Sequence, residues 1–170
     1  MKQTLAITVY NESGVLTRIS TVFSSRGFNI DSIAVGPTES NGISRIILVL
    51  PADDQKIEQI TKQLNKLIQV IEVKDLTLRA CVERELMLIK IKCENKFRQE
   101  LLEIVNIFRA KVVDLAYNSL TIQIVGDPGK IIAIQKLLNN QTFEVVEIVR
   151  TGKIAIERDL GINTQISKIA

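Results

Sequence analysis

Residues 10–37 read YNESGVLTRISTVFSSRGFNIDSIAVGP, and this stretch decides the fold of the first half of the chain. It begins at the end of a strand, passes through the polar turn 11–14 into an amphipathic helix, and stops at Gly27 before a second strand. A glycine-containing turn that enters a helix leaves backbone N–H groups without partners, and these donors suit a small carboxylate. Asn11 and Asn29 flank the helix, and each amide offers donor and acceptor atoms. The stretch therefore favours a site that holds a free amino acid rather than one that transforms it.

Each of these features also has an ordinary structural interpretation. The turn at 11–14 is compatible with a plain strand-to-helix connection in which glycine supplies a positive φ angle. Asn29 comes two residues after Gly27, and asparagine commonly begins a turn at such a place. Local physics alone therefore leaves the binding interpretation and the structural interpretation both open.

Hydrophobic periodicity around this stretch predicts the order β-α-β-β-α-β. Strands are expected where apolar residues alternate or cluster, and helices where they recur every three to four residues. The expected strands are 4–9, 30–35, 43–50 and 68–73, and the expected helices are 15–26 and a segment capped by Asp53 with apolar residues at 57, 60, 64 and 67. The strand at 43–50 is apolar on both faces, which indicates a central position covered on both sides. This order is the split βαβ, or ferredoxin-like, arrangement.

The same order follows a second time. The expected strands are 85–93, 111–117, 120–125 and 143–149, and the expected helices are 96–108 and a segment that opens with Asp127 as its N-cap and Pro128 as its first residue. The boundary falls around 78–84, so the sequence predicts an α+β chain of two tandem ferredoxin-like βαββαβ units, 1–79 and 80–170. The tail after Gly152 has Ile154 and Ile156, and its polar end beyond them is expected to fray.

The second unit repeats the pattern of the first but lacks its glycine turn. Asn95 has roughly the place of Asn11, but residues 96–98 (Lys-Phe-Arg) follow where the first unit has Glu-Ser-Gly. We therefore expect the second unit to keep the fold without the ligand turn. The stretch GDPGK at 126–130 lacks the spacing and the hydroxyl residue of a phosphate loop, so it is interpreted as a helix cap.

The composition disfavours a self-sufficient enzyme. The chain has 170 residues, is 46% hydrophobic and carries a formal net charge of +3, which is ordinary for a globular protein. It has no histidine, which excludes Ser-His-Asp and Cys-His catalysis and an imidazole metal site. Cys81 and Cys93 are too few for an iron–sulfur cluster or a structural zinc site, and we expect two unpaired thiols in a reducing compartment. No catalytic residue and no metal site is predicted.

Nucleic acids and membranes are not expected partners. Basic and acidic residues are spread evenly along the chain, so no basic face is indicated. RNA-binding domains of ferredoxin-like fold stack bases on aromatic side chains of their central strands, and the strands at 43–50 and 120–125 contain none. No run approaches the roughly 20 apolar residues of a membrane span. The residues after Met1-Lys2 begin a strand pattern and not a targeting peptide, so we expect the protein to work where it is made.

Three stretches of the first half are informative when they are taken together. They are NESGVLTR at 11–18, FSSRGFNIDS at 23–32 and VGPTE at 35–39. In combination they closely resemble the ACT domain of the acetolactate synthase small-subunit family. The resemblance continues at 62–67, 82–90 and 151–152, so it covers nearly the whole chain. The N-x-x-G piece alone occurs in many amino-acid-sensing ACT domains, whereas the combination is specific.

The resemblance implies an effector site at a dimer interface. Asn11 resembles the side chain that fixes the polar groups of the effector, and Gly14 and Val15 resemble the backbone positions that meet its carboxylate. Asn29 and Ile30 resemble contacts from the other protomer, because ACT domains of this family pair side by side. The family's effector is valine.

The resemblance also implies a non-catalytic regulatory subunit in the synthesis of valine, leucine and isoleucine. Its partner would be a large catalytic subunit, which it activates and makes sensitive to valine. Thiamine diphosphate, magnesium and FAD would belong to that partner, and no cofactor to this chain. Gly36 stands where some relatives have alanine, which would loosen the pocket wall. The expected location is the bacterial cytoplasm or the plastid stroma. A free-standing amino-acid sensor that regulates another enzyme or a transporter is the alternative.

Overall fold

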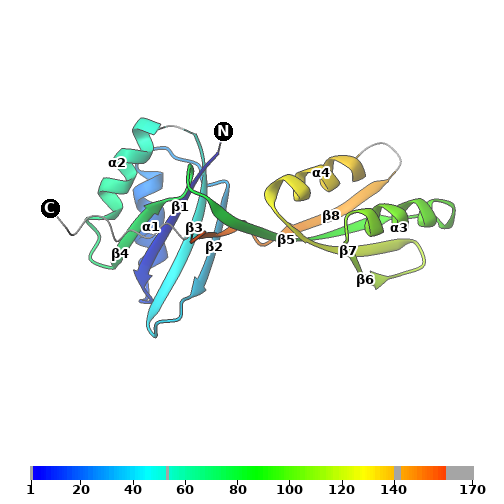
Figure 1. The fold of residues 1–170 in the computed structure, drawn as a ribbon, viewed down its shortest axis with the longest axis horizontal. Coiled ribbons are helices and arrows are strands. Elements are labelled where there is room, and N and C mark those ends of the chain that lie inside the picture. Colours follow the sequence, from blue (N-terminus) through cyan, green and yellow to red (C-terminus); the bar gives the residue numbers. More distant parts are fainter. Residues whose placement is uncertain (1, 53, 140–142, 160–170) are drawn as a thin grey trace.

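The computed structural model describes residues 2–52, 54–139 and 143–159, which form two α+β units joined by one long strand (Figure 1). The first unit comprises β1 Lys2–Tyr10, α1 Val15–Ser24, β2 Ser32–Pro37, β3 Ile43–Pro51, α2 Asp54–Leu64 and β4 Val70–Asp75. The second comprises β5 Cys81–Lys92, the 3-10 helix η1 Asn95–Phe97, α3 Arg98–Ile107, β6 Lys111–Leu115, β7 Ser119–Gly126, α4 Pro128–Leu138, β8 Glu144–Arg150 and β9 Ile154–Glu157. The predicted α+β class and the two ferredoxin-like units are confirmed.

The first sheet has the strand order β2-β3-β1-β4, with antiparallel neighbours throughout. Helices α1 and α2 lie on one face of it (Figure 1). Alternate residues of the two central strands point into the core between sheet and helices, because side chains alternate along a strand. The buried core consists of Leu5, Ile7, Val9, Val15, Ile19, Phe23, Ile46, Leu48, Leu50, Ile57, Ile60 and Leu64.

Helix α1 ends in a glycine cap, as predicted. Gly27 has a φ of 64°, and its N–H donates to the Ser24 carbonyl at 3.1 Å. The N–H of Phe28 donates to the Phe23 carbonyl at 3.0 Å, which completes a Schellman motif. The rings of Phe23 and Phe28 meet edge to face with centroids 6.5 Å apart. This cap takes up the last turn, so α1 ends two residues earlier than the expected 15–26.

The second unit repeats the arrangement with the strand order β6-β7-β5-β8. Helices α3 and α4 cover one face of its sheet (Figure 1), over a core centred on Met87, Ile89 and Ile91. The Asp127 carboxylate accepts a hydrogen bond from the Lys130 N–H at 3.0 Å, at the start of α4. The interpretation of residues 126–130 as a helix cap is therefore confirmed.

Strand β9, residues 154–157, lies in the tail after Gly152, where no strand was predicted. These residues pair with residues 81–84, which also makes β5 begin four residues earlier than expected. The resulting two-stranded ribbon packs on the outer face of the first sheet, the face opposite the helices, through Cys81, Ala155, Ala6, Ile47 and Leu76. It covers the second face of β3, which explains why the strand at 43–50 is apolar on both faces.

Some expectations fall outside this description. The predicted cap Asp53 and the tail beyond residue 159 are not among the described residues. The division of the chain at 79/80 stays a prediction. Among the helices that the structure describes, none is long and apolar enough to cross a membrane.

Candidate effector site

The turn between β1 and α1 borders a shallow pocket of about 140 Å³, which we call the turn pocket. Asn11, Gly14 and Val15, three of the five predicted site residues, line it. Leu16 of α1 and Val35 of β2 form part of its apolar side. The volume is below the about 300–1,000 Å³ of drug-sized sites. A small molecule of amino-acid size matches it better. Part of the surface of that molecule would stay uncovered, open to contact from a second protein surface.

Unpaired backbone donors meet at the turn pocket. Gly14 has a φ of 82°, in the left-handed region that glycine adopts freely, and turns the chain into α1. The N–H of Arg18 donates to the Gly14 carbonyl at 3.1 Å and closes the first helical turn. The N–H groups of Gly14, Leu16 and Thr17 have no acceptor among the described residues. Free N–H groups at the positive end of a helix are the donors that a carboxylate requires.

The other two predicted residues, Asn29 and Ile30, lie at the opposite end of α1. They precede Asp31, whose N–H donates at 2.9 Å to Val49 near the end of β3. The N–H of Asn11 instead donates at 2.7 Å to the residue just before β3 begins. Seven residues along a strand span roughly 23 Å. Within one chain, Asn29 and Ile30 are therefore too far from Asn11 to share a ligand with it.

Strand β2 is an edge of the first sheet, and its surroundings are apolar. Ile33 and Val35 lie on the helix side of β2, opposite core residues of β3, and they are 42% and 48% exposed. Leu16 of α1 is exposed beside the turn pocket as well. No strand in the described part of the chain pairs with the outer edge of β2. An exposed apolar edge of this kind is a template for pairing with a second strand.

In the second unit, Cys93 and not Asn95 occupies the position of Asn11. The N–H of Cys93 donates at 3.0 Å to Asn118, the residue just before β7, as that of Asn11 donates to the residue before β3. The expected correspondence with Asn95 was therefore two residues off. In the second unit Asn95 is instead the first residue of η1, a 3-10 helix between strand and helix that the first unit lacks.

The turn of the second unit is closed by its own arginine. The Arg98 guanidinium donates at 3.2 Å to the Ala116 carbonyl and at 2.7 Å to that of Tyr117. Burial raises the pKa of the nearby Cys93 thiol, and the positive charge of Arg98 offsets part of this shift. The second unit therefore has a thiol where the first has the amide of Asn11, and Phe97 precedes its helix where the first unit has Gly14.

Gly36 does not line the turn pocket. It alternates with Val35 along β2 and therefore points to the opposite face of the sheet. A Cβ added at Gly36 would meet no atom within 4 Å. Gly36 therefore forms no part of the wall of the turn pocket.

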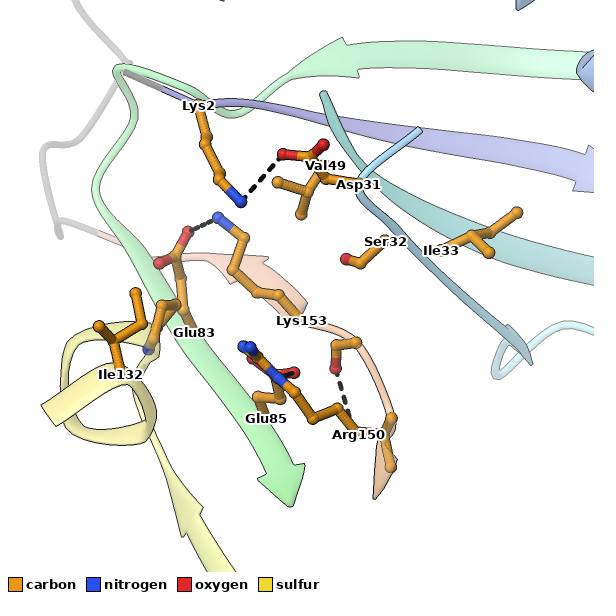
Figure 2. A pocket seen from close by; sticks show the side chains of 13 residues that line it. Lys2, Asp31, Ser32, Ile33, Val49, Glu83, Glu85, Ile132, Arg150 and Lys153 are labelled. Atoms are coloured by element: carbon orange, nitrogen blue, oxygen red, sulfur yellow. Dashed lines mark hydrogen bonds and ion pairs between the residues drawn. The ribbon is translucent and has the colours of Figure 1, made fainter. Parts of the chain in front are cut away.

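A larger pocket of about 460 Å³, which sequence reasoning missed, lies between the two units (Figure 2). We call it the junction pocket. Every charged side chain that lines it is paired with an opposite charge. The pairs are Lys2–Asp31 at 2.9 Å, Glu83–Lys153 at 2.6 Å and Glu85–Arg150 at 2.7 Å. Each pair lies within one unit, Lys2–Asp31 in the first and the other two in the second, and the pocket offers no free charge to a ligand.

Two of these pairs are well enclosed. Glu85 is buried, and its two oxygens accept hydrogen bonds from Arg150 at 2.7 and 2.8 Å, which raises the pKa of the arginine. Lys153, with a side chain that is 13% exposed, also donates at 2.7 Å to the Thr4 hydroxyl of β1. Figure 2 shows Lys153 reaching from the segment before β9 toward β5 and the first unit. No local sequence pattern marks these partners, because they are 65 or more residues apart.

The segment 151–153 also passes close to the start of β2. Gly152 has a φ of 81°, and a Cβ added to it would lie 3.3 Å from the Ile33 carbonyl oxygen and 3.4 Å from the Ser32 hydroxyl. Glycine is required here both by the backbone angle and by this close approach. The second unit thus contacts β2 three residues after Asn29.

Comparisons with known proteins place both halves of the chain in one family. Residues 5–72 match the model of the "AHAS small subunit-like ACT domain", and residues 84–159 match the "Small subunit of acetolactate synthase". The chain is 44% identical over 158 residues to a probable acetolactate synthase small subunit of Archaeoglobus fulgidus, covering 93% of this chain and 98% of that protein. It is 44% identical over 155 residues to the acetolactate synthase small subunit of Mycolicibacterium smegmatis, covering 91% and 90%.

Two further similarities concern a plant protein and a solved structure. The chain is 45% identical over 158 residues to "Acetolactate synthase small subunit 2, chloroplastic" of Arabidopsis thaliana, but it spans only 32% of that longer protein. The crystal structure of the acetolactate synthase small subunit from Thermotoga maritima superposes with a TM-score of 0.82 at 38% identity, covering 93% of this chain and 98% of that one.

The tandem ferredoxin-like fold and the ACT domain at its start define a regulatory protein. An ACT domain in a protein of this class fits a role in feedback regulation by amino acids. The chain belongs to the family of acetolactate synthase small subunits, the regulatory subunits of an enzyme whose catalytic activity lies in the large subunit.

Proposed function

We propose that this chain binds the large catalytic subunit of acetolactate synthase, raises its activity and makes it subject to inhibition by valine. The observation that carries the valine site is the turn pocket, where unpaired N–H groups of Gly14, Leu16 and Thr17 lie beside the apolar side chain of Val35. Valine has a carboxylate for these donors and a short branched side chain for the apolar wall. Asn11 would bind its ammonium group through the amide oxygen.

The site is complete only in a homodimer that pairs two β2 edges. In an antiparallel pair, the start of β2 in one protomer lies beside the end of β2 in its partner. Asn29 and Ile30 stand just before that start, and the turn pocket borders Val35 near the end. Twofold pairing therefore brings Asn29 and Ile30 of one protomer to the turn pocket of the other, and it also covers Ile33.

Valine bound at such an interface would favour one arrangement of the two ACT domains. The contacts of Gly152 with Ser32 and Ile33 connect β2 to the second unit. Asn29 is three residues from Ser32, so a backbone shift at Asn29 would be transmitted to the second unit through this contact with Gly152. Coupling free energies of this kind are typically about 1–3 kcal/mol and act in both directions for binding.

The chemistry of the enzyme belongs to the partner in this proposal. Thiamine diphosphate, magnesium and FAD would be held by the large subunit. The protein would act in the cytoplasm of a bacterium or an archaeon, or in the plastid stroma. The named bacterial and archaeal relatives and the chloroplastic one support these alternatives.

Mixed dimers test the composite site. One chain carries Asn11→Ala and the other Asn29→Ala, with different affinity tags, and the heterodimer is purified with the large subunit. In the proposed geometry a homodimer of either variant loses both of its sites. The heterodimer keeps one intact site, formed by Asn11 of the Asn29→Ala chain and Asn29 of the Asn11→Ala chain. We expect valine inhibition to be lost in each homodimer and to return in the heterodimer, with about half the wild-type valine stoichiometry by calorimetry.

The opposite result is equally clear. If Asn11 and Asn29 acted within one chain, no intact site would exist in the mixture, and the heterodimer would stay insensitive. A wild-type chain that neither binds nor activates a large subunit from the same organism would refute the regulatory proposal itself.

A further inference from the structure

An apolar groove of about 400 Å³ lies on the side of β2 that faces away from the turn pocket, between β2 and the β5–β9 ribbon. We call it the outer groove. Its lining comes from the first sheet (Ala34, Val35, Gly36, Pro37, Arg45 and Ile47) and from the ribbon (Val82, Arg84, Ile154, Ala155 and Ile156). Among the described residues that line it, the only charged side chains are two arginines. The groove is therefore mostly apolar, and the charged groups that line it are positive.

The ribbon contributes an uncovered apolar face. Val82 lies opposite Ile156 and Arg84 opposite Ile154, so these four side chains share one face of the ribbon. The other face carries Ala155, which packs on the first sheet. Ile154 and Ile156 are 56% and 60% exposed. A two-stranded ribbon with branched apolar side chains on its open face gains stability when a further element covers it.

Arg45 supplies the second feature of the outer groove. It is half-buried on the outer face of β3, and no described residue forms an ion pair or hydrogen bond with its guanidinium. Gly36 is its neighbour on β2 in the sheet register, and the missing side chain there leaves one flank of Arg45 open. A half-buried guanidinium without a partner is desolvated in part and gains from a carboxylate.

Arg84 is less free than Arg45. It donates at 2.7 Å to the Glu83 carbonyl. The hydrogen bond from the Lys130 N–H is the main cause of the lowered pKa of Asp127, and the charge of Arg84 adds to that shift. These contacts hold its guanidinium at the end of the groove and leave other N–H donors of its fork available. The two arginines thus present cationic groups beside a row of isoleucines.

We propose that the outer groove is the docking site for an extended segment of the catalytic subunit that carries carboxylate side chains beside apolar ones. An extended segment fits because β9 has only β5 as a partner among the described strands, so its second edge can accept a further strand. A second copy of this chain fits less well, since 22 basic residues against 19 acidic ones offer no acidic excess to the arginines. This proposal rests on the proposed regulatory function and names the surface that performs it.

Two full-length variants test the outer groove. Arg45→Glu reverses the unpaired charge, and Ile156→Glu puts a carboxylate on the exposed apolar face. Each is mixed with wild-type large subunit, and the dissociation constant is measured by biolayer interferometry together with activation of acetolactate formation. We expect at least tenfold weaker binding for each variant. We also expect the affinity of the wild-type chain for the large subunit to fall as the salt concentration rises, and to fall less steeply for a third variant, Arg45→Gln.

Matched controls carry the same changes elsewhere. Lys136→Glu reverses an exposed charge on α4, and Ile107→Glu alters an isoleucine that is 76% exposed at the end of α3. Both controls should bind within twofold of wild type. Calorimetry with valine and sedimentation in the absence of the large subunit show whether the groove variants still bind valine and still form dimers.

Three outcomes overturn the proposal. Groove variants that bind the large subunit within twofold of wild type would show that the catalytic partner docks elsewhere. Loss of the homodimer in these variants would assign the groove to a second copy of the chain. Equal loss in the controls would mean that charge and not position is responsible. A wild-type chain without any affinity for the large subunit would instead contradict the regulatory function.

Discussion

At the scale of single residues, Gly14 determines how the turn pocket meets a ligand. Its φ of 82° is left-handed, and a Cβ built there would meet no atom within 4 Å of the same chain. Aspartate is among the residues that enter the left-handed region most readily. A change to aspartate therefore has room in its own protomer, and its main effect is a negative charge beside the donors.

We expect Gly14→Asp to abolish valine inhibition while folding and activation of the large subunit survive. The added carboxylate repels that of valine and competes for the same N–H groups. Loss of one charge-assisted hydrogen bond is worth about 1.5–3 kcal/mol, which corresponds to valine binding that is at least about tenfold weaker. The measurement is holoenzyme activity against valine concentration, with circular dichroism to check the fold.

Gly14→Asn is the matched control for this change. Asparagine enters the left-handed region as readily as aspartate and has nearly the same size, but it carries no charge. It reports the cost of a side chain at this position without the added negative charge. Normal valine inhibition in a folded Gly14→Asp protein would show that the effector binds elsewhere.

At the scale of elements, the two edges of the first sheet differ in what they leave exposed. The β2 edge carries Ile33 and Val35 next to the turn pocket, whereas the β4 edge carries Ile71 with Glu72 and Lys74, which form an ion pair of 3.3 Å. Charged residues on an edge strand discourage further pairing. The β2 edge is accordingly the one we expect to form the dimer.

We expect Ile33→Lys to dissociate the dimer and Ile71→Lys to leave it intact. The two isoleucines are 42% and 44% exposed, so the changes are matched in burial. At a twofold interface the lysine would be introduced twice on neighbouring strands, where two like charges repel. Sedimentation equilibrium should show a dissociation constant at least about tenfold higher for Ile33→Lys. A stable Ile33→Lys dimer, or a monomeric Ile71→Lys protein, would assign the interface to another surface.

At the scale of the whole molecule, Lys153 of the junction pocket connects the second unit to the first through its hydrogen bond to Thr4. Lys153 pairs with Glu83 of β5 (Figure 2). It also donates to the Thr4 hydroxyl of β1, and its side chain is largely enclosed. Buried pairs are sensitive to the loss of one partner, because the other charge is then left without compensation. Exposed pairs such as Glu58–Lys62 on α2 contribute little.

We expect Lys153→Met to lower the free energy of unfolding by about 2 kcal/mol, from lost hydrogen bonds to a charged group. Lys62→Met, the same change in the exposed pair, should leave stability nearly unchanged. Urea unfolding followed by circular dichroism measures both. Adding Glu83→Gln to Lys153→Met should recover part of the loss, because it removes the unpaired carboxylate. Equal stability of the two lysine variants would mean that the contacts of Lys153 with Glu83 and Thr4 do not stabilise the junction of the units.

The local elements of this protein were predictable because their causes are local. The glycine cap of α1, the N-cap Asp127 and the alternation along β7 each depend on a few neighbouring residues. The fold class was confirmed for the same reason, since the repeated order of elements leaves few ways to bury their apolar faces. The turn pocket was indicated by a glycine and an asparagine at fixed spacing, and its role in binding valine stays a proposal.

The sequence by itself determined the two ferredoxin-like units, the family and the turn that presents free N–H groups. Only the tertiary structure decided that β9 pairs with residues 81–84, that Cys93 takes the place of Asn11, and that Gly36 faces the outer groove. It also decided that Asn29 lies too far from Asn11 to act within one chain. The physical reason is that these features depend on contacts between residues far apart in sequence, whereas periodicity and capping record only what each residue does with its near neighbours.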